Sequence, residues 1–234
     1  MEIANDAGDD IVRYAIQDVS KNPYCVIFPY RFVHSAVFYH EQNPEIRVVL
    51  LEGRHPQDDI IPFFLQNEQV FIYRTDIEDE FYRAGLAAAS LAEENKSIAV
   101  FIDSHQYSLF GLQAKEAFFS GLNDFFQFSL SPQVNIYTSV SELSENFDFS
   151  SVLMIGAGVD FFEINLKTAV FLFSWLDPLF LPSGIIMIID DSPWAQVTAA
   201  VKMADKKENE PIKSKFTILD RKKFNKELYR KLSN

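Results

Sequence analysis

Two adjacent carboxylates follow a run of purely apolar residues, and they are the side chains of this sequence best suited to bind a ligand. The run is Ile185-Ile-Met-Ile-Ile189, and Asp190 and Asp191 come directly after it. Carboxylates in this position can accept hydrogen bonds from ribose hydroxyls or hold a cation. They can equally cap a helix that begins near Pro193, because the first N–H groups of a helix need an oxygen acceptor. Both interpretations remain open at this stage.

The remaining motifs do not form a catalytic set. Gly156-Ala-Gly158 follows an apolar run and could cradle a phosphate, but Phe162 stands near the place of the third glycine of a dinucleotide fingerprint. A tight turn between a strand and a helix explains these glycines better. The four histidines lack the spacing of metal ligands, no Gly-x-Ser-x-Gly elbow occurs, and Cys25 lies inside an apolar run. We therefore predict a protein that is not an enzyme and that holds no metal and no cofactor.

The surrounding elements must position these residues, and the sequence alternates between short apolar runs and amphipathic segments. The runs are apolar on both faces, which is typical of buried parallel strands; they cover 25–28, 47–51, 69–73, 97–102, 134–137, 152–155, 185–189 and, near the C-terminus, 215–219. Helical periodicity is found at 9–20, 31–41, 78–94, 112–126, 140–145, 160–176 and 222–232. The alternation predicts an α/β fold with parallel sheets covered on both faces.

In such sheets the ligand binds beyond the carboxyl ends of the strands. Besides the two aspartates, the residues expected at these ends include Tyr30, Asp103, Ser104, Gly156 and Gly158. These residues are therefore candidate ligand contacts.

The composition is that of a globular protein, with 234 residues of which 48% are apolar and 23% charged. The 21 basic and 33 acidic residues give a formal net charge of −12, which argues against a surface built for nucleic acid or anionic lipid. A single cysteine excludes a disulfide framework within the chain. Residues 168–189 are very apolar, but Asp177, Pro178 and Pro182 divide them, so a buried helix and strand are expected rather than a transmembrane segment.

The two ends of the sequence differ in charge. The first ten residues are acidic and contain no apolar core of a signal peptide, and the compartment remains unknown. Lys206 to Asn234 carry basic residues in two clusters. Their basic face is either solvated or in contact with an anionic partner.

Several short motifs resemble, in the same order, those of the basic membrane protein (BMP) family, type I periplasmic solute-binding lipoproteins that include purine-nucleoside receptors. Phe81-Tyr-Arg-Ala-Gly-Leu-Ala-Ala-Ala89 and Ser97-Ile-Ala-Val-Phe-Ile102 are similar to an alanine-rich helix of that family and the strand that follows it. Ala117–Leu122 is similar to a later helix of the family, and Val152–Gly158 to the strand and turn after it. Asp190-Asp191 is similar to its ligand-facing strand end, and Val197–Lys202 to its crossover. The resemblance extends over about residues 9–205.

The resemblance implies two Rossmann-like lobes with parallel sheets, joined by crossover strands and holding a ligand between them. The first lobe would comprise residues 1–75 plus about 193–234, and the second residues 76–192. We expect a shortened first lobe, since the first two strands of the family would precede Asp9. Asp103-Ser104 stand in place of the family's glycines after the 97–102 strand, and Ala200 replaces its crossover serine.

The implied function is non-catalytic binding of a small polar molecule, such as a nucleoside, in a transport or sensing system at the cell envelope. The implied partner is the permease of an ABC transporter. The resemblance places Asp190, Lys202, Gly156 and Asp103 in the ligand site, and Phe28, Tyr30 and Trp194 are the residues best placed to stack on a base. The alternative is a degenerate module of the same fold that acts in protein–protein interaction, or as the sensor domain of a larger regulator.

Overall fold

The computed structural model describes residues 23–29, 32–52, 68–102, 111–126, 132–139, 142, 149–155, 169–173, 184–190, 193–208 and 210–233. The chain forms two compact units. Unit 1 contains the described residues up to Thr75 together with Pro193–Ile212, and unit 2 contains Asp76–Ser192 and the residues from Lys213 onward. The chain therefore passes from one unit to the other three times, after Thr75, after Ser192 and after Ile212.

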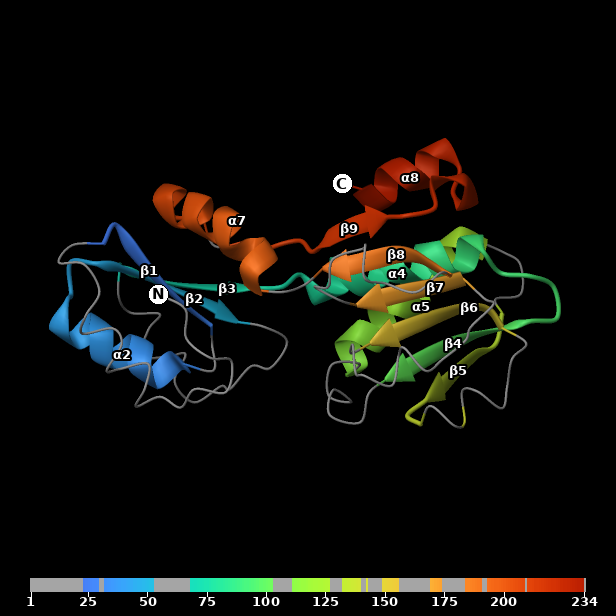
Figure 1. Cartoon of the computed structure of the whole chain (residues 1–234), viewed down its shortest axis with the longest axis horizontal. Helices are drawn as coiled ribbons and strands as arrows, with labels where there is room; N and C mark the ends of the chain where they lie inside the picture. The colour runs from blue at the N-terminus through green and yellow to red at the C-terminus, as the bar shows by residue number, and fades with distance from the viewer. Residues whose placement is uncertain are drawn as a thin grey trace. The chain divides into compact units, whose positions relative to one another are not determined.

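Unit 1 is a small parallel sheet with a helix on each face (Figure 1). Its strands are β1 (Cys25–Pro29), β2 (Arg47–Glu52) and β3 (Val70–Arg74), in the order β1-β2-β3. Successive residues of a strand point to opposite faces. Val48 and Leu50 accordingly pack with α2 (Val33–Gln42), while Val49 and Leu51 pack with α7 (Pro193–Lys206). The helix that covers the second face thus comes from the distant part of the chain that returns from unit 2.

Unit 2 is built on a larger, mixed sheet. Its strand order is β5 (Val134–Tyr137), β4 (Ser97–Ile102), β6 (Phe149–Ile155), β7 (Ala169–Phe173), β8 (Ile185–Asp190) and β9 (Lys215–Ile218). All neighbouring strands are parallel except β9, which pairs antiparallel with β8 at the edge. The parallel arrangement agrees with the runs that are apolar on both faces, because every residue of β6 is buried.

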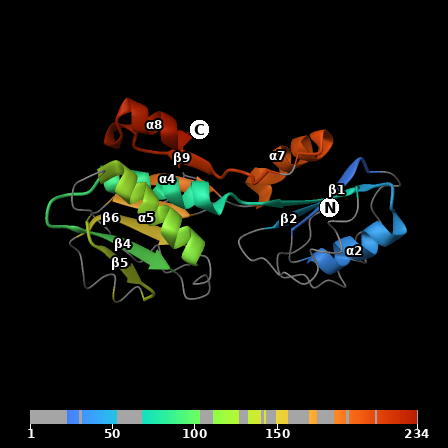
Figure 2. The same ribbon diagram turned by 180° about the vertical axis from the view of Figure 1, so that it is seen from behind.

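Three helices pack against one face of this sheet and share one hydrophobic core with it. They are α4 (Ile77–Ser90), α5 (Leu112–Phe126) and α8 (Lys226–Ser233), the last preceded by the short helix η5 (Arg221–Lys223). Figure 2 shows α5, α4 and α8 succeeding one another beside the sheet. The helices α4 and α5 approach very closely, because a Cβ added at Gly85 would lie 2.1 Å from the carbonyl oxygen of Phe118. Glycine is therefore required at this crossing.

The structure changes two of the sequence expectations. The helix predicted over 160–176 is wrong for 169–173, which form β7 between β6 and β8. Its residues Ala-Val-Phe-Leu-Phe suit a strand buried on both faces, and periodicity cannot distinguish so short an apolar run from a buried helix. In addition, residues 213–233 join unit 2 rather than the lobe of residues 1–75, because β9 pairs with β8 and α8 packs on α4. The predicted helix 9–20 lies outside the described residues.

Candidate functional site

Asp190 is the candidate ligand contact that the structure places most clearly. It is the last residue of β8, at the carboxyl edge of the parallel strands, and its side chain is half-buried. The other described strands of unit 2 that run in this direction end at Ile102, Tyr137, Ile155 and Phe173, none of which is charged. Asp190 therefore provides a carboxylate at an otherwise uncharged row of described strand ends.

A basic residue of the neighbouring strand lies directly opposite this aspartate. In the antiparallel register of β8 and β9, Asp190 faces Lys215, whose side chain is exposed. Residues directly opposite in such a ladder have Cβ atoms about 4.5–5.5 Å apart, and opposite charges there contribute roughly 0.2–1 kcal/mol. The register thus places a lysine opposite Asp190, which the two sequence interpretations, ligand contact and helix cap, did not consider.

Most of the other candidate contacts lie outside the described residues. Among them are the residues that follow strand ends, namely Tyr30, Asp103, Ser104, Gly156, Gly158 and Asp191. The backbone of Trp194 is described as part of α7, but its side chain is not. Lys202 is exposed on α7 in unit 1, whereas Asp190 belongs to unit 2. These residues remain predictions as ligand contacts.

The chain segments that connect the units are held together on the unit 1 side by buried polar contacts. Gln196 of α7 donates a hydrogen bond of 2.9 Å to the hydroxyl of Thr75, and both side chains are buried. The backbone N–H of Ile212 donates to the carbonyl of Arg74 at 2.7 Å, and Ile212 forms a parallel bridge with Thr75. All three crossings therefore begin or end at one hydrogen-bonded cluster of unit 1.

On the unit 2 side, the contacts of Arg83 hold the connecting segment in place. Its buried guanidinium donates to the carbonyl oxygens of Ser214 (2.9 Å) and Leu232 (3.1 Å) and lies 2.6 Å from the carboxylate of Asp79. The guanidinium also stacks on the ring of Phe216, with its carbon 3.9 Å from the ring centroid. Arg83 thus fixes both the segment that enters unit 2 after Ile212 and the end of α8. Sequence reasoning missed this role, because nothing in a helical pattern marks one arginine as buried.

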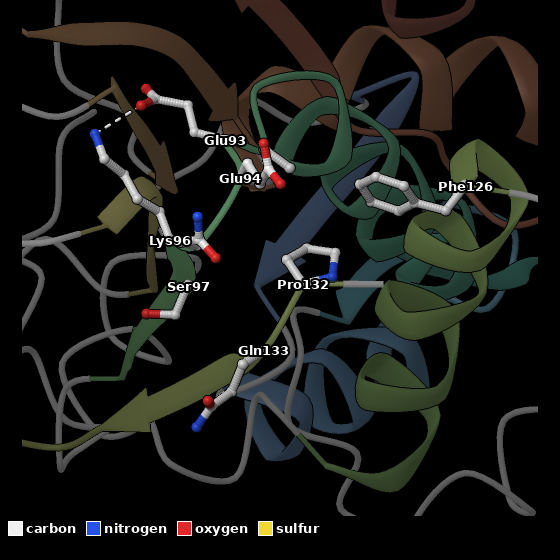
Figure 3. A pocket seen from close by; sticks show the side chains of 9 residues that line it. Glu93, Glu94, Lys96, Ser97, Phe126, Pro132 and Gln133 are labelled. Atoms are coloured by element: carbon white, nitrogen blue, oxygen red, sulfur yellow. Dashed lines mark ion pairs between the residues drawn. The ribbon is translucent and has the colours of Figure 1, made fainter. Parts of the chain in front are cut away.

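One cavity that the described residues line does not lie at the carboxyl edge of the sheet. It has a volume of about 690 Å³ and is lined by residues 92–97, Phe126, Pro132 and Gln133 (Figure 3). Ser97 is the first residue of β4, and Gln133 directly precedes Val134, the first residue of β5. Within the cavity Lys96 pairs with Glu93 at 2.6 Å. The cavity is therefore at the amino ends of the strands, opposite to the edge where α/β sheets bind ligands.

A second hollow, of about 460 Å³, lies between α4 and α5 and is lined by Glu78, Asp79, Tyr82, Gln113, Glu116, Ala117 and Ser120. We refer to it as the α4/α5 groove.

Across the described part of the chain, no group of three or more His, Cys, Asp and Glu residues could hold a metal ion. No helix of the described segments is both long and apolar enough to span a membrane.

Comparison with solved structures identifies the class of fold. No family model matches the chain, and a search of curated proteins finds no match. A transcriptional activator of the comK gene from Bacillus halodurans is 12% identical, with a TM-score of 0.64 over 97% of this chain and 82% of that one. An ABC transporter periplasmic solute-binding protein from Actinobacillus succinogenes with bound D-allose is 15% identical, with a TM-score of 0.55 over 94% of this chain and 85% of that one.

A LacI family transcriptional regulator from Enterococcus faecium with bound ribose is 11% identical, with a TM-score of 0.56 over 92% of this chain and 83% of that one. At these identities the likeness concerns the fold alone. The chain has the α/β fold of the type I periplasmic-binding-protein class, which transcriptional regulators share. This agrees with the fold expected from the sequence, while nothing in the comparisons singles out the basic membrane protein family.

Proposed function

We propose that this chain is a non-catalytic binding protein for a small polyhydroxylated molecule, a sugar or a nucleoside, in a transport or sensing system. The observation that carries the proposal is the fold, which consists of two units built mainly on parallel strands and joined by three crossings. It is similar to the fold of proteins solved with ribose and with D-allose. Among the described residues, the carboxylate of Asp190 lies at the end of one of the parallel strands. Binding without chemistry is the function that best fits these features.

Asp190 would contact the ligand through its carboxylate. A carboxylate accepts two hydrogen bonds, and ribose and hexoses both present neighbouring hydroxyls that can donate them. The residues after the other strand ends, Asp103, Ser104, Gly156 and Gly158, would complete the contacts, with Lys202 from α7. Tyr30 or Trp194 would stack on a sugar ring or on a base. In a transport system the chain would act outside the cytoplasm together with an ABC permease.

The second candidate is the sensor domain of a larger transcriptional regulator. It is favoured by one observation, the TM-score of 0.64 and the 97% coverage with the transcriptional activator from Bacillus halodurans. Both candidates bind a small molecule and differ in the partner. A permease of an ABC transporter in a pull-down from membranes would support the first candidate, and a DNA-binding domain in the same polypeptide would support the second.

The test of ligand binding is a thermal-shift screen against ribose, hexoses, nucleosides and, as a negative series, amino acids. A ligand present at 100 times its dissociation constant adds about 2.7 kcal/mol to the free energy of unfolding, because it binds only the folded chain. We expect a rise in melting temperature with at least one sugar or nucleoside, confirmed by calorimetric titration. A protein that responds to no sugar and no nucleoside would contradict the proposal.

A matched pair of variants tests the role of Asp190. Asp190→Asn removes the charged acceptor, and since hydrogen bonds to charged groups are worth about 1.5–3 kcal/mol, affinity should fall roughly 10–100-fold. Lys215→Gln removes the opposite charge in the β8–β9 ladder and should leave affinity unchanged while lowering stability by less than about 1 kcal/mol. Should Asp190→Asn bind as tightly as the unaltered chain, Asp190 would not be a ligand contact.

A further inference from the structure

The outer face of η5 and α8 carries positive charge that the described chain does not neutralise. Residues 221–231 contain six basic residues and one acidic residue, a contribution of +5, so the remainder of a chain with net charge −12 carries −17. Lys231 pairs with Glu227 at 3.7 Å, and Arg221 stacks on Tyr229. The exposed side chains of Lys222, Lys223, Lys226 and Arg230 have no ion-pair partner among the described residues. We call these four residues the basic face.

The helix that carries the basic face is firmly packed into unit 2. Leu228 and Leu232, on the opposite side of α8, are buried in the core of unit 2, and Phe224 is buried beside them. The guanidinium of Arg83 binds the carbonyl of Leu232 and so holds the last turn of the helix. The four cations are therefore presented from a fixed helix and not from a loose tail, which reduces the entropy lost when a partner binds.

A surface of opposite charge lies in the same layer of helices. The α4/α5 groove is lined by Glu78 and Glu116, both exposed, and neither has an ion-pair partner within the described segments. Asp79, the third carboxylate of the groove, is already neutralised by Arg83 and by Lys213 at 3.2 Å. Leu112, which precedes the groove-lining Gln113 in α5, is 74% exposed.

The two surfaces lie side by side, because α5, α4 and α8 succeed one another on the same face of the sheet and share one core (Figure 2). A two-fold axis running between them places the basic face of one copy opposite the α4/α5 groove of the other. The reverse contact then forms at the same time, since a two-fold interface is reciprocal. Side-by-side patches of opposite charge thus fit a closed pair of identical chains.

We infer that the basic face binds the α4/α5 groove of a second copy of this chain, so that unit 2 forms a reciprocal, salt-sensitive dimer. The occupant is argued from charge complementarity. The chain itself provides an acidic surface, with Glu78 and Glu116, that is complementary to the four cations. Exposed ion pairs are individually weak, so the dimer depends on several acting together and on ionic strength.

The first test measures the mass of the full chain in solution by sedimentation velocity over a range of concentrations. We expect dimers at low salt and monomers at high salt, because the Debye length falls from about 10 Å at 0.1 M to about 3 Å at 1 M. Reversing the basic face with Lys226→Glu and Arg230→Glu should weaken dimerisation about tenfold or more. Reversing the groove with Glu78→Lys and Glu116→Lys should do the same. A monomer at every concentration in low salt would overturn the inference.

A mixing experiment distinguishes reciprocal pairing from general electrostatic attraction. When the two reversed variants are combined, both contacts regain opposite charges, so a mixed dimer should form although neither variant dimerises alone. Glu45→Lys with Glu210→Lys, two exposed carboxylates of unit 1, is the control with the same charge change as the groove variant, and it should dimerise like the unaltered chain. Thermal denaturation of each variant shows that it is folded.

Two outcomes would assign the basic face to another occupant. The chain is also titrated with vesicles containing phosphatidylglycerol and with duplex DNA. If either binds the chain, loses affinity on reversal of the basic face, and no dimer is found, then the second copy is not the partner. Failure of the mixed dimer to form from two folded variants would equally overturn the reciprocal arrangement.

Discussion

His40 is a buried titratable side chain whose behaviour can be tested directly. It lies in α2 with 7% of its surface exposed, and burial lowers the pKa of its imidazole below the ordinary value of 6.5, opposed by the nearby Glu41. Well above pH 6.5 the histidine is neutral in both the folded and the unfolded chain. As the pH falls below 6.5, the unfolded chain takes up a proton that the folded chain resists, so the free energy of unfolding should decrease towards the lower folded pKa.

Chemical denaturation at several pH values between about 5 and 7 tests this expectation, since unperturbed histidine titrates there. His40→Gln should flatten the dependence in that window. His34→Gln, at an exposed position of the same helix, is the matched control and should leave the dependence as it is. An unchanged slope in His40→Gln would show that this residue is not the source.

For individual residues, the place of a side chain in the fold could be predicted from the sequence better than the residues that surround it. It placed Asp190 at the end of a buried strand, and the structure agrees. It did not reveal Lys215 opposite Asp190, because an antiparallel return after 25 residues is set by tertiary packing and not by a local pattern. It also did not reveal that Arg83 is buried, since arginine is rarely buried without several acceptors supplied by distant segments.

At the scale of elements the crossing of α4 and α5 gives a sharp prediction. Replacing Gly85 by alanine would place the new Cβ 2.1 Å from the carbonyl oxygen of Phe118. Overpacking of this kind costs about 1–3 kcal/mol, which exceeds the 0.8–1.0 kcal/mol that alanine gains over glycine in a helix. We therefore expect Gly85→Ala to lower the free energy of unfolding measured in denaturant. Ser120→Ala, at an exposed position of α5, is the control and should be close to neutral. A more stable Gly85→Ala variant would mean that the helices lie farther apart.

Helices and strands with a clear hydrophobic period were predicted well from the sequence. The short apolar run that forms β7 was not. The alanine-rich helix and the strand after it appear as α4 and β4, because a long amphipathic pattern and a β-branched run each have one interpretation. The run that forms β7 was assigned to a helix, since five apolar residues fit either structure. The run is a strand because β6 and β8 pair with it on its two sides.

At the scale of the whole molecule the division into units can be tested by expression of parts. Phe216, Phe224, Leu228 and Leu232 are buried in the core of unit 2, and β9 covers the edge of β8. Residues 76–192 alone would leave this core and this edge exposed, and exposed strand edges promote aggregation. We expect residues 76–192 joined by a short linker to 213–233 to be soluble and to unfold cooperatively, whereas 76–192 alone should aggregate. Equal behaviour of both would favour the division predicted from the sequence, in which 193–234 belong with residues 1–75.

The three crossings also impose an order on biosynthesis. The second face of the unit 1 sheet is covered by Ala200 and Ala204 of α7, and the core of unit 2 is closed by residues 216–232. A ribosome that adds about 5–20 residues per second needs roughly 6–24 seconds to travel from Thr75 to Pro193. During that interval the nascent β1-β2-β3 sheet has one uncovered apolar face, because α7, the helix that covers it, has not yet been synthesised. The chain is therefore expected to depend on holding chaperones during translation far more than a protein whose units are contiguous in sequence.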